Sequence, residues 1–188
     1  TPLQIATAYA ALGNGGLLHQ PSFVKDQHNP PKRVLDENIA HEVLRMMQTV
    51  TEPGGTATQA AILGYHVAGK TGTSRKASAG GYSRRYIGYF AGLVPVDHPR
   101  FAMVVAVNDP DPSRKGYYGG VVAGPVFRST MEGALRLMDV APDNLDAWLA
   151  VQDAAEAKRA KAAGHAAPQL ASVAPAATSK LPAPGGVQ

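Results

Sequence analysis

The first helical pattern lies at the beginning of the chain. Apolar side chains recur on one face over residues 3–10 at the three- and four-residue spacing of a helix. Thr1 can cap such a helix, and Pro2 suits its first position. Gly13 offers a left-handed stop, after which residues 17–31 are expected to form a short extended piece and a polar loop. We interpret this helix as scaffold.

A second helix is expected after Asp36, which can serve as its N-cap. The sequence Pro-Gly-Gly at residues 53–55 ends the helical run, and residues 56–61 favour a short helical turn. The apolar stripe of this helix is predicted at Ile39, Val43, Met46 or Met47, and Val50.

Three β-type runs follow, over residues 67–73, 87–94 and 100–108. The last two are separated by only five residues, which is too few for a parallel crossover, so an antiparallel meander is expected. Because residues 101–107 are apolar almost throughout, they are expected to form a central strand covered on both faces. The polar, basic and glycine-rich residues 74–86 are expected to form a loop over a pocket.

The end of the chain changes in composition. A helix is expected over residues 126–138, with a stripe at Phe127, Met131, Leu135 and Met138 that packs across the sheet. We divide the chain into a folded portion (1–144), an Ala-rich helical extension (145–163) and a disordered Ala- and Pro-rich tail (164–188). The whole pattern predicts an α/β (α+β) fold in which helices flank an antiparallel sheet.

Composition narrows the class of protein. A chain of 188 residues with 45% hydrophobic residues can bury one ordinary core, and no run approaches the length of a membrane span. The absence of cysteine excludes disulfides, thiol catalysis and cysteine metal sites. The six histidines show no ligand-like spacing, so we predict no metal and no cofactor. Because Thr1 is an unusual start, we expect a segment of a longer protein whose membrane anchor lies upstream.

Charge is unevenly distributed, although the net charge is only +4. No acidic residue occurs between Pro53 and Val96, and this implies an anionic partner near the central strands. No nucleic-acid motif accompanies the charge, so we expect no nucleic acid. The basic residues of this region are Lys70, Arg75, Lys76, Arg84 and Arg85.

Residues 68–73, Ala-Gly-Lys-Thr-Gly-Thr, are the strongest candidate for chemistry. Their glycines leave no side chain between the backbone and a ligand, so amide N–H groups can point at an oxygen that gains charge. Lys70 adds a positive charge. On an extended strand Arg75 shares the face of Thr73, where its guanidinium could hold a substrate carboxylate.

The same stretch also fits the phosphate-loop pattern. Residues 64–71 match G-x-x-x-x-G-K-[ST]. A phosphate loop follows a buried strand and opens a helix, whereas here a helical turn precedes the pattern and glycines follow it. A P-loop nucleotide-binding protein is therefore the weaker alternative.

Five sequence blocks stand in an order that resembles class B penicillin-binding proteins over roughly residues 1–144. The resemblance is nearest to the division-specific peptidoglycan D,D-transpeptidases of Gram-negative bacteria. The blocks are Thr1–Gln4 with Ala8–Ala11 and Asn14–Gly16, then Glu52–Ala57, Ala68–Thr73, Phe90–Gly92 and Ala123–Phe127.

This resemblance implies that the chain carries one wall of a transpeptidase site that cross-links peptidoglycan stem peptides in the septum. Lys70 would supply charge near the substrate carboxylate, and the hydroxyls of Thr71 and Thr73 would bind that carboxylate. The N–H of Thr73, after Gly72, would be the second oxyanion-hole donor.

The resemblance also implies a substrate, partner proteins and a cellular location. The substrate is the D-Ala-D-Ala end of a stem peptide, which the strained amide of a β-lactam mimics. Tyr117 and Tyr118 would form an aromatic wall of the pocket, with Arg75 as a further substrate-binding residue. The resemblance places the protein at the periplasmic face of the inner membrane, among divisome membrane proteins.

Parts of the family pattern are missing. No Ser-x-Asn or Tyr-x-Asn triplet occurs, and the Ser-x-x-Lys at Ser22 to Lys25 precedes Lys70 in an extended stretch, so we interpret it as a coincidence. The nucleophile is then expected outside this chain, and the isolated segment is expected to be inactive. A non-catalytic divisome or peptidoglycan-binding module stays open as a third function.

Overall fold

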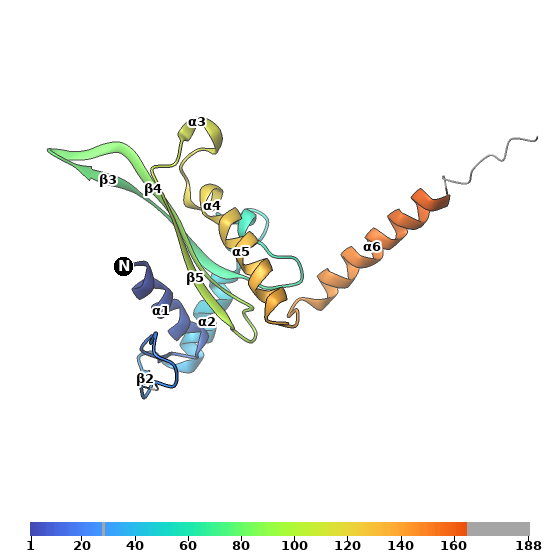
Figure 1. Cartoon of the computed structure of the whole chain (residues 1–188), viewed down its shortest axis with the longest axis horizontal. Helices are drawn as coiled ribbons and strands as arrows, with labels where there is room; N and C mark the ends of the chain where they lie inside the picture. The colour runs from blue at the N-terminus through green and yellow to red at the C-terminus, as the bar shows by residue number, and fades with distance from the viewer. Residues whose placement is uncertain (28, 165–188) are drawn as a thin grey trace, which may run out of the picture. The chain divides into compact units, whose positions relative to one another are not determined.

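A three-stranded antiparallel sheet of order β3-β4-β5 organises the fold (Figure 1). The computed structural model describes residues 1–27 and 29–164, and its contacts divide the chain into two units, residues 1–151 and 152–188. The sheet belongs to the first unit, and it confirms the expected meander. Its strands are β3 (Ala68–Ser78), β4 (Gly81–Val94) and β5 (Phe101–Asn108).

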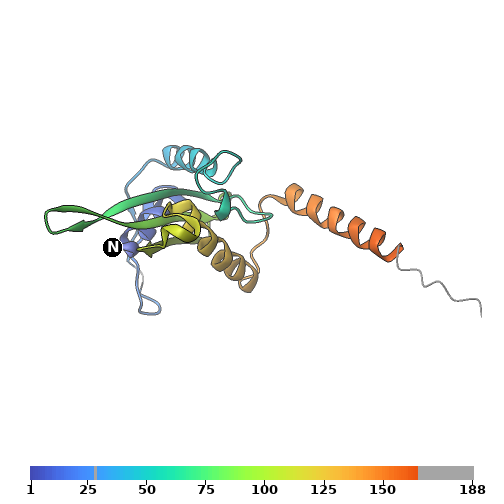
Figure 2. The ribbon, with the colours of Figure 1, turned by 90° about the horizontal axis from the view of Figure 1, so that it is seen from above.

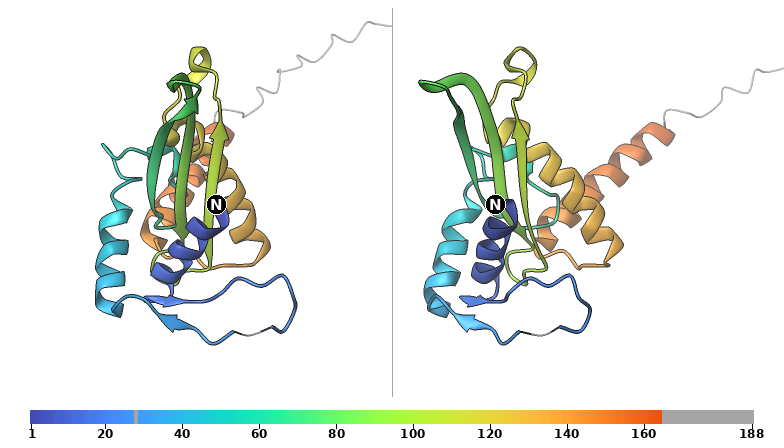
Figure 3. Two further views of the ribbon diagram at one scale, coloured as in Figure 1. Left: turned by 90° about the vertical axis from the view of Figure 1, so that its left-hand side faces the viewer. Right: turned by 60° about the vertical axis from the view of Figure 1, so that its left-hand side comes forward.

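Helices cover both faces of the sheet, as expected (Figures 2 and 3). The first face carries α1 (Pro2–Gly13) and α2 (Glu37–Gln48), and the second carries α4 (Gly119–Val122), α5 (Gly124–Leu137) and the short helical turn η1 (Thr58–Ala60). Side chains of β4 alternate between the two faces, so Phe90 contacts Phe127 of α5 while Leu93 packs with Leu44 of α2. The central strand is therefore β4, which is mostly buried over its second half, residues 88–94.

The expected helix starts are confirmed. Thr1 caps α1 through a capping box with Gln4, and the Asp36 carboxylate accepts from the first turn of α2. The expected left-handed stop at Gly13 is wrong, because the helix includes Gly13 and the positive φ angles fall on the two glycines that follow Asn14. The chain then forms β1 (Leu17–Leu18), which pairs with β2 (Lys32–Arg33).

The segment expected to be a loop over a pocket is instead a β-hairpin. Its two strands continue outward to Ser78 and Gly81, with a register shift between Arg75 and Ala77. Its residues are mostly exposed, so hydrogen bonding between the strands, rather than burial, holds the hairpin together. The expectation of a central strand at residues 101–107 is also wrong, because β5 is an edge of the described sheet.

Two apolar stripes differ from their predicted form. In α2 the buried residues are Ala40 and Leu44, while Ile39 and Met46 are exposed. In α5 the stripe is confirmed except for Met138, which follows the helix and is exposed.

The expected C-terminal helix is present as α6 (Leu145–Gly164), which begins in the first unit and continues into the second. Trp148 anchors its beginning, because a Cβ atom added to Gly64 would lie 2.8 Å from Trp148 Cδ1. The short helix α3 (Pro112–Lys115) precedes α4. None of the helices among the described residues is both long and apolar enough to cross a membrane. The predicted tail covers residues 164–188; Gly164 is the last residue of α6, and residues 165–188 lie outside the described residues.

Candidate active site

The candidate residues Lys70, Thr71, Gly72 and Thr73 lie on β3, which is an edge of the described sheet. Side chains alternate along a strand, so Lys70 and Gly72 face one side while Thr71 and Thr73 face the other. Nζ of Lys70 donates to the backbone oxygen of Thr71 at 3.1 Å. Lys70 is exposed and forms no ion pair with any described residue, so its charge is available to an anion.

Both threonine hydroxyls are held by residues from other segments. Oγ1 of Thr71 lies 3.0 Å from Oγ1 of Thr56, and Oγ1 of Thr73 accepts from the backbone N–H of Gly119 at 3.1 Å. These contacts fix the two hydroxyls on the α4 side of β3. Sequence reasoning did not assign a role to Thr56 or Gly119, because only the fold brings them to β3.

The glycines of β3 have a different role from the one expected. A Cβ atom on Gly72 would lie 2.0 Å from a ring carbon of Tyr89, its partner on β4, and one on Gly69 would lie 2.4 Å from Phe90 Cζ. The space over both glycines is thus filled by aromatic rings, not left open to a ligand. Because Gly72 has no side chain, the Tyr89 ring can lie across β3 and pack against its backbone.

Arg75, Tyr117 and Tyr118 come together beside Thr73. The rings of Tyr86 and Tyr117 stack with centroids 4.0 Å apart, and Tyr118 lies 4.8 Å from Tyr117. The Arg75 guanidinium lies 5.9 Å from the centre of the Tyr86 ring. A hydrogen bond with Tyr118, and then the charge of the neighbouring hydroxyls, raises the pKa of Tyr117. The structure therefore gathers all three expected substrate-binding residues at one end of the candidate wall.

The phosphate-loop interpretation is wrong. Lys70 lies inside a strand that continues to Ser78, so no helix begins at Lys70 and no helix N-terminus is available for phosphates. Ser22 lies in an exposed loop, where it donates to Oε1 of Gln27 at 2.8 Å. The Ser-x-x-Lys stretch is therefore not part of the β3 site.

The fold and the site define a class. Penicillin-recognising serine enzymes carry a Lys-Thr-Gly stretch, and here that stretch lies on β3, an edge strand of the described sheet. Residues 1–132 match the family model of the penicillin binding protein transpeptidase domain. The chain belongs to this family, and the resemblance to class B penicillin-binding proteins is confirmed.

Within this family, the chain is similar to several peptidoglycan D,D-transpeptidases and to a solved transpeptidase domain. The chain is 46% identical over 147 residues to the peptidoglycan D,D-transpeptidase FtsI of Escherichia coli, covering 77% of this chain and 25% of that protein. It is 45% identical over 142 residues to the probable peptidoglycan D,D-transpeptidase PenA of Neisseria meningitidis, covering 74% and 24%. The apo TP domain of Burkholderia pseudomallei penicillin-binding protein 3 superposes with a TM-score of 0.66 at 35% identity, covering 74% of this chain and 43% of that domain. The chain thus spans about a quarter of the length of these curated relatives.

Proposed function

We propose that this chain is part of a peptidoglycan D,D-transpeptidase that cross-links stem peptides in septal cell-wall synthesis by serine acyl transfer. The observation that supports the proposal most is the anchoring of two threonine hydroxyls beside an exposed lysine on an edge strand. A serine nucleophile and its base, supplied from outside residues 1–188, complete the site.

The proposed roles are those that the resemblance to the family implies for these residues. Lys70 supplies positive charge near the substrate carboxylate, which the hydroxyls of Thr71 and Thr73 bind. The N–H of Thr73 donates to the oxygen that gains charge, an interaction of a kind worth roughly a hundredfold to a thousandfold in rate. Arg75 and the two tyrosines Tyr117 and Tyr118 contact the rest of the substrate or of a β-lactam.

The proposed setting is the periplasmic face of the inner membrane, where the anchor of the full-length protein would hold this domain next to its substrate. Divisome membrane proteins are its proposed partners. The FtsI relative supports the peptidoglycan substrate by its described activity.

The test is the acylation of the full-length protein by a labelled penicillin. We expect Lys70→Ala to slow labelling by at least about a hundredfold with little change in melting temperature, because the side chain is exposed and fills no core volume. Lys76→Ala is the matched control, since it removes a lysine from the same strand outside the proposed site. Near-normal labelling of a folded Lys70→Ala protein would contradict the assignment, and absence of labelling in the wild type would favour a non-catalytic module.

A further inference from the structure

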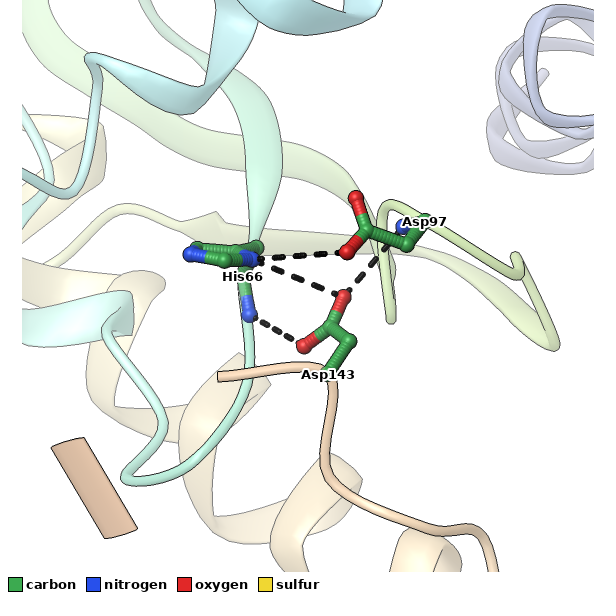
Figure 4. A group of neighbouring side chains, drawn as sticks. All are labelled: His66, Asp97 and Asp143. Carbon is green, nitrogen blue, oxygen red and sulfur yellow. Dashed lines mark hydrogen bonds and ion pairs between the residues drawn. The ribbon is translucent and has the colours of Figure 1, made fainter. Parts of the chain in front are cut away.

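Three side chains come together near the start of β3: His66, Asp97 and Asp143 (Figure 4). His66 lies two residues before β3, Asp97 lies between β4 and β5, and Asp143 lies between α5 and α6. Nδ1 of His66 is 3.8 Å from Oδ2 of Asp143 and 4.0 Å from Oδ2 of Asp97. Three segments that are distant in sequence thus contribute one side chain each.

The Asp143 carboxylate joins two other segments of the backbone by hydrogen bonds. Its Oδ1 accepts from the backbone N–H of His66 at 2.7 Å, and its Oδ2 accepts from those of Val96 and Asp97 at 3.0 and 3.3 Å. The side chain is only 7% exposed. A carboxylate offers about four acceptor positions, so the three amide bonds leave one position free, on Oδ1.

The group lacks a positive charge. Within the described part of the chain, neither Asp97 nor Asp143 forms an ion pair with a lysine or an arginine. Nδ1 of His66 is buried and has no hydrogen-bond partner, because both carboxylate oxygens are too far away to accept from it. Two carboxylates and a buried imidazole nitrogen therefore surround a position that no described cation fills.

We propose that His66, Asp97 and Asp143 bind a divalent transition-metal ion, with Zn²⁺ as the representative ion. Imidazole favours such metals over Mg²⁺ and Ca²⁺, and carboxylates are common companions of histidine in zinc sites. Two ligands of a tetrahedral zinc ion lie about 3.4 Å apart, given bonds of about 2.0 to 2.2 Å. The separations of 3.8 and 4.0 Å need a small inward movement of the His66 and Asp97 side chains, which are 39% and 56% exposed.

Such an ion would act on the fold rather than on the reacting atoms. It would join the lead into β3, the β4–β5 connection and the α5–α6 connection, and His66 is only four residues before Lys70. Binding to the folded state alone raises stability by mass action. We expect the ion to fix the start of the strand that carries the candidate wall, with water completing its coordination. Sequence spacing did not predict this site, because its ligands are far apart along the chain.

The test measures metal, not catalysis. The full-length protein is stripped with a chelator, equilibrated with Zn²⁺, and analysed for bound zinc by mass spectrometry and for affinity by calorimetry. We expect the wild type to hold one zinc ion more than His66→Gln, whose affinity at this site falls by at least about tenfold. His98→Gln, which removes an exposed histidine next to Asp97, is the control and should bind as the wild type does.

Melting temperature gives an independent readout. Zn²⁺ should raise the melting temperature of the wild type and of His98→Gln, but not that of His66→Gln or Asp97→Asn. The Asp97 variant keeps the amide bonds to Asp143, so it serves if His66→Gln folds poorly. Equal zinc content in all variants would overturn the proposal. So would a wild type whose melting temperature does not respond to Zn²⁺.

Discussion

Gly119 offers the sharpest test of how the candidate wall is held. It is buried at the start of α4, and a Cβ atom there would lie 2.2 Å from the backbone oxygen of Tyr89 and 2.4 Å from that of Gly72. Both obstacles are main-chain atoms of paired strands, which cannot rotate away as a side chain could. Gly119→Ala should therefore push α4 away from the sheet.

The expected loss of stability has two parts. Overpacking at a tight site costs roughly 1 to 3 kcal/mol. The displaced helix also loses the hydrogen bond from the Gly119 N–H to Oγ1 of Thr73, which contributes about 1 kcal/mol. We expect the free energy of unfolding to fall by about 2 to 4 kcal/mol, measured by denaturant unfolding of the full-length protein. Acylation by labelled penicillin should slow as well, because the Thr73 hydroxyl loses its donor.

Gly133→Ala is the matched control. Gly133 lies within α5, and a Cβ atom there meets nothing within 4 Å. Alanine in a helix interior is favoured over glycine by roughly 0.5 to 1 kcal/mol, so this variant should be slightly more stable than the wild type. If Gly119→Ala were as stable as Gly133→Ala, the close packing of α4 on β3 and β4 would be refuted.

Three further outcomes follow from other contacts. Arg75→Ala should weaken acylation more for β-lactams with an added side-chain carboxylate than for those without one. Equal losses of acylation rate for both drug types would show that Arg75 does not bind that carboxylate. Removing all residues after Val151 should leave the melting temperature unchanged, whereas Trp148→Ala should lower it by several degrees because Trp148 packs beside a loop glycine. The hydrogen bond from Arg85 lowers the pKa of Asp109 below 3.8, so its stabilising effect is present above that pH and disappears as pH falls through the folded-state pKa. Acid melting curves of the wild type and Asp109→Asn should therefore converge at low pH, and the carboxyl resonance of Asp109 should titrate below 3.8.

The helix starts could be read from the sequence because their chemistry is local. The hydroxyl of Thr1 and the carboxylate of Asp36 bond to N–H groups only two or three residues away, and these bonds are present. The order of the three strands was also accessible, because the short connection between the last two permits only an antiparallel pair.

The β-hairpin could not be read in the same way. Residues 74–86 are polar and include glycines, which are signals of a loop, yet the backbone of each strand is paired by the other. The register shift after Arg75 shows that the pairing tolerates an irregularity. Hydrophobic periodicity does not predict these strands, because neither face of the hairpin is buried.

The candidate wall shows most clearly what a motif leaves undetermined. Lys70 and Thr73 could be proposed from their own short stretch, but the atoms that hold the candidate wall come from elsewhere: Thr56 from the loop before η1, Gly119 from α4 and Tyr89 from β4. Each of these contacts depends on packing between segments, which no short pattern encodes. Substitutions at these supporting positions should therefore alter acylation while the Lys-Thr-Gly motif itself stays unchanged. For the same reason, a search confined to the motif would miss the residues through which the reactivity of the site can be tuned.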